Sequence, residues 1–178
     1  MVLIAFLGNP GKKYTTTRHN IGFLIGEYFT NKYGIKCTQK AFLGFVGMGK
    51  VEGKDVCVLV PHTYMNNSGK SVSQALNFYK IEPKSLIAVH DEIEFTFGRF
   101  EMKFGGGHKG HNGIRSIMSF IDTGDFSRLR FGVGRPDDPR ISVSDYVLGN
   151  FLDSELEDIK GKLPDVCDML VKVIGECG

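Results

Sequence analysis

The chain has 178 residues, a formal net charge of +2 and 24% charged residues, which fits one globular domain and gives no indication of a nucleic-acid partner by itself. No apolar stretch approaches the length of a membrane-spanning helix, so a protein that crosses the membrane by helices is excluded. The four cysteines show neither a C-x-x-C pair nor metal-like spacing, and we expect reduced thiols in a cytoplasmic protein.

The first half of the sequence alternates apolar strands with amphipathic helices. The continuous apolar run at residues 2–7 predicts a strand that is buried on both faces. Residues 20–29 carry apolar side chains along one helical stripe, which predicts a helix. Residues 43–60 predict a hairpin that turns near 52–54, and helical spacing returns at 68–80.

The second half of the sequence continues this alternation. Strands are predicted at residues 85–89, 98–104 and 126–134. A glycine-rich loop at 105–113 leads into a helix that begins near Asn112. The last segment, 151–176, has a helical pattern, and Gly161 and Pro164 predict a break within it.

Buried strands that alternate with helices are typical of α/β proteins. The order of the predicted elements indicates a single three-layer α/β domain over residues 1–178, in which helices flank a mixed, mostly parallel twisted sheet. No internal repeat, low-complexity tract or interdomain linker interrupts the pattern.

Polar side chains follow three of the predicted buried strands, at the point where each strand ends. These are Asn9, Asn66 and Asp91. Ligands of open α/β sheets bind outside the carboxyl ends of the strands, so these side chains share one rim if the strands are parallel. His19 opens the following helix and Asn112 opens a later one, and both can face the same rim.

Histidine beside a carboxylate is the usual general-base pair, in which the carboxylate fixes the tautomer of the imidazole. The helix that follows His19 places it near a positive dipole end, and we expect this to keep the imidazole neutral near pH 7. Asparagines can hold a peptide-like substrate or donate to an oxyanion. No nucleophile elbow of the G-x-S-x-G type occurs. The pattern therefore predicts hydrolysis of an acyl bond by a histidine-activated water.

Six blocks of the sequence carry distinctive glycine and polar patterns. They are FLGNPGKKYTTTRHNIGF, PHTYMNNSGKSV, HDEIEFTFG, KFGGGHKGHNGIRSI, RLRFGVGRP and VLGNF. From about residue 3 to 152 these blocks resemble, in order, the motifs of the bacterial-type peptidyl-tRNA hydrolases. The resemblance implies cleavage of the ester between a peptide and the 3′ ribose of tRNA, which recycles the tRNA. It also implies a cytoplasmic monomer without metal or other cofactor.

The resemblance implies roles for individual residues of these blocks. His19 is the catalytic histidine of the TRHN block, and Asp91 of the HDE block is its partner. The asparagines Asn9, Asn66 and Asn112 are expected to position the peptide and the attacking water.

Further residues of the blocks are expected to bind the two ends of the substrate. Tyr14 is expected to line the substrate site. Tyr64, which stands where phenylalanine is common in the family, is expected to bind substrate beside it. Lys103 and Arg130 match basic positions that bind the 5′ phosphate of tRNA. The sequence departs from the family in the third block, where IEFTFG lacks two prolines.

Other interpretations of the same residues stay open. His108 and His111, with Asp91, could be metal ligands of a hydrolase, although their spacing in a glycine loop is a weak metal signal. The loop could instead contact a phosphate through its backbone. The chain could also be an RNA-binding relative without catalysis. His90 is expected to be a structural neighbour of Asp91 rather than a catalytic group.

A basic surface patch around the glycine-rich loop is a further expectation. Six cations fall within a short stretch, namely Lys103, Lys109, Arg115, Arg128, Arg130 and Arg135. Such a patch would bind the RNA backbone and make binding sensitive to salt.

Overall fold

The computed structural model describes residues 1–177 and contains a seven-stranded sheet in the order β2-β3-β4-β1-β5-β7-β6. Its four central strands, β4, β1, β5 and β7, are parallel. They span Lys54–Pro61, Val2–Phe6, Leu86–Glu92 and Ser127–Gly132. The outer strands β2 (Gln39–Ala41), β3 (Gly44–Val51) and β6 (Phe100–Phe104) pair antiparallel.

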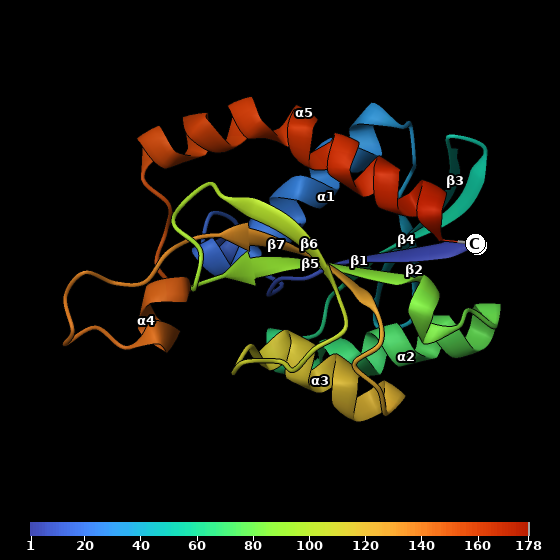
Figure 1. The fold of residues 1–178 in the computed structure, drawn as a ribbon, viewed down its shortest axis with the longest axis horizontal. Coiled ribbons are helices and arrows are strands. Elements are labelled where there is room, and N and C mark those ends of the chain that lie inside the picture. Colours follow the sequence, from blue (N-terminus) through green and yellow to red (C-terminus); the bar gives the residue numbers. More distant parts are fainter. Residues whose placement is uncertain (178) are drawn as a thin grey trace.

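Helices cover both faces of this sheet, as Figure 1 shows. On one face lie α1 (Ile21–Lys32) and α5 (Asp153–Glu176), and on the other α2 (Ser68–Tyr79) and α3 (Asn112–Ile121). The short helix α4 (Val143–Val147) stands apart at one end. The predicted three-layer α/β fold is therefore confirmed. No helix of the described part is long and apolar enough to cross a membrane.

The central strand β1 explains why its sequence is apolar at every position. Val2, Ile4 and Phe6 pack into the core beneath α1 and α5. Leu3 and Ala5 point the other way, into the core against α2 and α3. A strand alternates its side chains between two faces, so a strand that is covered on both sides needs apolar residues throughout.

The parallel pairing brings the ends of β1, β4 and β5 to one rim, as predicted from the sequence. β5 extends further than the predicted segment 85–89 and includes His90 and Asp91. The carboxylate of Asp91 is therefore held by strand pairing with β7, where Asp91 lies opposite Phe131. A side chain on a paired strand is more rigidly placed than one in a loop.

The predicted break in the last helix is wrong, because α5 is continuous from Asp153 to Glu176 with Pro164 inside it. Pro164 is exposed, while Leu163, Val166 and Cys167 on either side of it are buried in the core. The packing of this apolar stripe compensates for the backbone hydrogen bond that proline removes. Neither β2 nor α4 was predicted, since three and five residues are too short to show a period.

A test of this packing uses two glycines of the helices on the same face. A Cβ atom at Gly22 would lie 2.4 Å from the carbonyl oxygen of Leu7 and 2.7 Å from that of Val89, whereas one at Gly161 would have no neighbour within 4 Å. We predict that Gly22→Ala lowers the free energy of unfolding by about 3 kcal/mol through overpacking. Gly161→Ala should raise it by about 0.5–1 kcal/mol, because alanine is the better helix former.

Urea unfolding of both variants measures this difference. Equal stabilities would show that α1 does not approach β1 and β5 as closely as described.

Candidate active site

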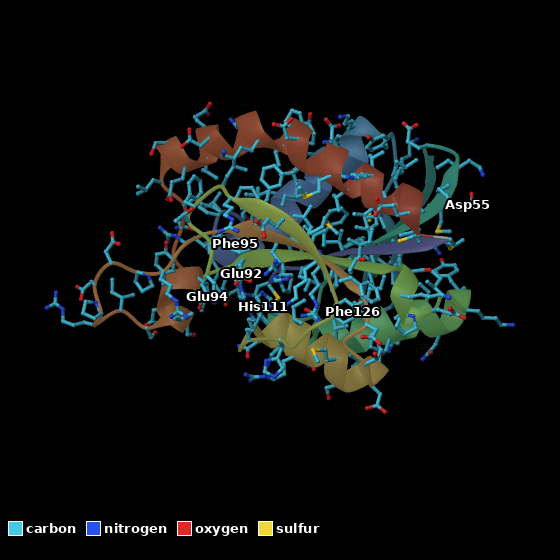
Figure 2. The ribbon with its side chains drawn as sticks, viewed as in Figure 1. Asp55, Glu92, Glu94, Phe95, His111 and Phe126 are labelled. Atoms are coloured by element: carbon cyan, nitrogen blue, oxygen red, sulfur yellow. The ribbon has the colours of Figure 1, made fainter. Side chains whose placement is uncertain are left out.

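A cleft of about 440 Å³ opens at the rim where the parallel strands end. Its lining contains eight of the nine site residues predicted from the sequence, namely Asn9, His19, Tyr64, Asn66, Asp91, Lys103, Asn112 and Arg130. Figure 2 places His111 and Glu92 near this end of the sheet and Asp55, on β4, at the opposite end. The ninth residue, Tyr14, lies outside the lining, with its ring edge-on to that of Tyr64 at 6.4 Å.

The imidazole of His19 and the carboxylate of Asp91 meet at the centre of this cleft. Nδ1 of His19 lies 2.8 Å from Oδ2 of Asp91, and the two residues are 8% and 2% exposed. His19 stands in the 3₁₀ turn Arg18–Asn20, just before α1. Because Nδ1 donates to the carboxylate, the lone pair of Nε2 is left to accept a proton from a ligand or water.

A second imidazole, that of His111, binds the other oxygen of the same carboxylate. Nε2 of His111 lies 2.8 Å from Oδ1 of Asp91. Nδ1 of His111 caps α3 and accepts from the backbone N–H groups of Gly113 and Ile114, at 3.1 and 3.2 Å. An acceptor nitrogen carries no proton, so the proton of His111 resides on Nε2 and points at Asp91. Asp91 therefore receives hydrogen bonds from two histidines.

The pKa values of this group follow from its burial and its charges. Burial alone would lower the pKa of His19, but the charge of Asp91 and its hydrogen bond outweigh it, so the pKa is raised above 6.5. Burial alone would raise the pKa of Asp91, but the interactions with His19 and His111 prevail and lower it. The prediction that a helix dipole keeps His19 neutral is therefore wrong in sign, because the carboxylate is in direct contact.

His90 is a structural neighbour of this group, which agrees with the sequence interpretation. Its Nδ1 lies 2.7 Å from the backbone oxygen of Asp91, and burial lowers the pKa of the imidazole to about 3. The ring packs 4.6 Å from that of His111, and its buried Nε2 has no partner among residues 1–177. His90 is thus a neutral group that adds no charge beside Asp91.

Asn9 is fixed by two neighbours, so that its amide has one orientation. Its side-chain oxygen accepts from the backbone N–H of Met65 at 2.7 Å. The side chain of Asn20 bonds both the backbone N–H and the backbone oxygen of Asn9, at 2.8 and 2.9 Å. Since the oxygen is occupied, the amide NH₂ of Asn9 is the group that remains for a ligand.

The other polar residues at the cleft are more exposed than the histidine pair. Asn66 lies in the 3₁₀ turn Met65–Asn67, and Asn112 is the first residue of α3. Both are exposed, and Tyr64 is 59% exposed. The only partner of the Asn112 side chain among the described residues is Arg115, at 3.3 Å. These side chains are accessible to a ligand at the mouth of the cleft.

The basic residues near the glycine-rich loop differ in their accessibility. Lys103 and Lys109 line the cleft and make no ion pair among residues 1–177. Arg130 lies 3.6 Å from both Glu92 and Glu101, so its charge is partly compensated. The pKa of Lys103 is lowered, first by desolvation and then by the neighbouring cations.

The expectation that Arg128 belongs to a surface patch is wrong, because this residue is only 3% exposed. Its guanidinium donates to the carbonyl oxygens of Gly106 and Gly107, both at 2.7 Å, and of Gly124 at 3.2 Å. Arg128 therefore holds the glycine-rich loop in place from the protein interior. Arg135 is likewise occupied, in an ion pair with Glu94.

His19, Asp91 and His111 are also the residues that could hold a metal, since their ligand atoms lie within 4.8 Å of one another. His108, which the sequence suggested as a ligand, is not in this group; its Nδ1 accepts from the backbone N–H of Gly110. A metal on Nε2 of His111 would require the proton to move to Nδ1, where two backbone N–H groups already point. The residues present therefore fit a proton-transfer network better than a metal site.

The sequence suggested His111 beside Asp91 only as a possible metal ligand, and the hydrogen bonds that His111 and Asn20 make in the site were not predicted. Both lie inside recognised blocks, beside the named residues Asn112 and His19. The signal that could have indicated His111 is its place directly before a helix, where the side chain can cap the first turn. Asn20 has no such signal, since its function depends on contacts with the backbone of Asn9.

Comparison with known proteins identifies the family. The family model described as peptidyl-tRNA hydrolase matches residues 3–177. The chain belongs to the peptidyl-tRNA hydrolase family. It is 44% identical to the peptidyl-tRNA hydrolase of Syntrophotalea carbinolica, over 98% of this chain and 88% of that protein. It is 46% identical to that of Trichlorobacter lovleyi, over 98% and 90%.

The fold agrees with a solved member of the peptidyl-tRNA hydrolase family. The structure of peptidyl-tRNA hydrolase from Acinetobacter baumannii matches this chain with a TM-score of 0.88 at 40% identity. The match covers 99% of this chain and 92% of that one. The resemblance inferred from the sequence blocks is thus confirmed.

The electrostatics of the histidine pair predict a specific titration. In an NMR titration, we expect the imidazole of His19 to change protonation above pH 6.5, because Asp91 stabilises its charged form. In Asp91→Asn, the negative charge that raises the pKa of His19 is removed, while the burial that lowers it remains. The pKa of His19 should therefore fall below 6.5. A wild-type His19 that titrates below 6.5, or a variant that titrates unchanged, would contradict the described pairing.

Proposed function

We propose that this chain hydrolyses the ester that joins the carboxyl end of a peptide to the 3′ ribose of tRNA, and so recycles peptidyl-tRNA. Family membership supports this reaction class. The single observation that carries the catalytic assignment is the 2.8 Å hydrogen bond between His19 and the buried Asp91 in the cleft. It supplies an oriented base, which ester hydrolysis by water requires.

His19 is the proposed general base. Its Nε2 takes a proton from a water molecule, and that water attacks the carbonyl carbon of the ester. Asp91 stabilises the imidazolium that forms, because its carboxylate stays ionised. The imidazolium then protonates the departing ribose oxygen, which breaks the ester and returns His19 to its neutral form.

The asparagines around the base are proposed to hold the substrate. The amide NH₂ of Asn9 is oriented by the Met65 N–H and donates to the peptide backbone. Asn112, at the start of α3, is proposed to hold the attacking water. Asn66 and nearby backbone N–H groups are proposed to stabilise the tetrahedral oxyanion. Tyr64, with Tyr14 behind it, provides an apolar surface beside the peptide.

The RNA end of the substrate is proposed to lie on the β6 side of the cleft. Lys103 and Lys109 are there without ion-pair partners among residues 1–177, and Arg130 stands beside them. A terminal phosphate can displace the distant carboxylates from Arg130, since both lie at 3.6 Å rather than in close contact. Recognition of this kind uses the backbone and not the base sequence.

We propose a cytoplasmic monomer. The four free cysteines support a reducing compartment, and burial raises the pKa of Cys57 to about 12 and that of Cys37 to about 11. Thiols with so high a pKa stay protonated and unreactive at neutral pH.

The catalytic assignment is tested by release of labelled peptide from purified peptidyl-tRNA. We predict that His19→Ala and Asp91→Asn each lower kcat by about 10²–10⁴-fold, as expected for loss of a general base or of its orienting carboxylate. Affinity for tRNA should change by less than about twofold, because neither side chain binds phosphate. The matched control is Asp55→Asn, an exposed carboxylate at the opposite end of the sheet.

Unchanged turnover in His19→Ala would refute the proposed mechanism. A wild-type protein that shifts tRNA on a gel and leaves the ester intact would instead support the non-catalytic RNA-binding interpretation.

A metal hydrolase is the second candidate function, because His19, Asp91 and His111 form a possible ligand group. The proton on Nε2 of His111 argues against it, and we predict that a chelator changes kcat/KM by less than about twofold. The control adds zinc after the chelator. Loss of activity that zinc restores would favour the metal hydrolase and contradict the proton-transfer mechanism.

A further inference from the structure

A second groove, of about 630 Å³, lies on the same rim as the catalytic cleft. Its walls include Lys40, Leu43, Phe45, His62 and Thr63. We call it the distal groove. β2 ends, β3 begins and β4 ends at this rim, because β3 runs antiparallel to its two neighbours. The distal groove and the catalytic cleft therefore open on the same side of the sheet.

The linings of the distal groove and the catalytic cleft meet in one short segment of the chain. His62 and Thr63 line the groove, and the next residues, Tyr64 and Met65, line the cleft. A ligand that leaves the cleft past Tyr64 therefore passes close to the groove.

A row of aromatic rings runs from the distal groove to Gly8, the residue before Asn9 of the cleft. The exposed imidazole of His62 lies edge-on to the ring of Phe45, at 4.6 Å, and stacks on that of Phe23, at 6.1 Å. The ring of Phe23 in turn covers Gly8, where a Cβ atom would lie 2.9 Å from it, and Gly8 directly precedes Asn9. Aromatic faces of this kind bind extended peptide segments with little loss of side-chain entropy.

The outer wall of the distal groove is preformed. Phe42 and Leu43 both adopt left-handed backbone conformations, with φ of 53° and 58°, in the tight turn between β2 and β3. Ser71 of α2 donates to the carbonyl of Phe42, and the backbone N–H of His62 donates to that of Leu43 at 2.9 Å. A two-residue hairpin turn requires this conformation at both central residues, and these two bonds hold Leu43 in place at the wall of the groove.

Thr63, which lines the distal groove, carries a polar group that is unpaired in the described part of the chain. The hydroxyl of Thr63 is buried and has no hydrogen-bond partner among residues 1–177. Buried polar atoms are normally paired, so this hydroxyl can form one more hydrogen bond, and a peptide N–H or C=O in the groove can take it up only if the Thr63 side chain turns toward the groove.

The basic residues of the rim lie on one side of the cleft, so the RNA and the peptide of the substrate are expected to lie on opposite sides. Lys103 and Lys109 lie on the β6 side of the cleft, whereas the distal groove lies beyond β4 on the other side. The polyanionic RNA is attracted to the lysine side, and the groove, with aromatic walls and a single lysine in its lining, is left for an uncharged chain.

On the basis of the proposed function, we propose that the distal groove binds the part of the peptide that lies upstream of the ester. Three strand spacings separate β5, which carries Asp91, from β3, or about 14 Å, and an extended peptide covers this span with about four residues. The groove then contributes to binding only when the peptide is longer than this.

The test compares a short with a long substrate. The short one is N-acetyl-aminoacyl-tRNA, and the long one is the same tRNA carrying a peptide of about eight residues, twice the span estimated from the strand spacing. The measured quantity is the ratio of kcat/KM for the long substrate to that for the short one. The variants are Phe45→Ala and, in case this partly buried residue is needed for folding, His62→Ala on the exposed ring.

We expect the ratio to fall by about three- to tenfold in both variants, as for the loss of one aromatic contact. The matched control is Met48→Ala, an exposed apolar residue further along β3 and away from the rim, which should leave the ratio at the wild-type value. A ratio that stays unchanged in Phe45→Ala and His62→Ala overturns the proposal for the groove, even when the wild type cleaves both substrates. Failure of the wild type to cleave either substrate would instead overturn the proposed function itself.

Discussion

The carboxylate of Asp91 is the constraint on which the site depends. It is almost fully buried and accepts from two imidazoles, those of His19 and His111, which come from different segments of the chain. A buried charge is stable only when it is paired and hydrogen-bonded, so the fold must deliver both donors to it. The same interaction therefore joins β5, the turn before α1 and the start of α3 at one point.

The backbone around this carboxylate is arranged by close contacts that only glycine permits. Gly22 lets α1 approach the carbonyl oxygens of Leu7, just after β1, and of Val89, within β5. This close approach fixes the distance of His19, just before α1, from the sheet. Gly69 lets α2 touch α3, where a Cβ atom would lie 2.1 Å from the carbonyl of Ser116. Helices placed so closely leave little freedom in the distance between their N-termini, and His19, Asn66 and Asn112 stand at or just before these N-termini.

The sequence predicted the architecture well because apolar periodicity is a local signal. The buried strands at 2–7 and 85–89 and the hairpin at 43–60 were found in this way, and family motifs indicated His19 and Asp91. Features that arise from distant contacts could not be predicted. The proton on Nε2 of His111 depends on its cap of α3, and the continuity of α5 through Pro164 depends on core packing.

The buried guanidinium of Arg128 has a consequence for the glycine-rich loop above it. A glycine-rich segment would otherwise adopt many backbone conformations, and a partner that binds it would have to offset the loss of this conformational entropy. The fork of N–H groups beneath the loop carbonyls selects one state when the chain folds. The loop thus allows a partner to approach its backbone closely, as glycine permits, and it is already held in one conformation before the partner binds. A lysine at position 128 could not replace the arginine, because its single nitrogen cannot donate to several carbonyl oxygens in the same fixed geometry.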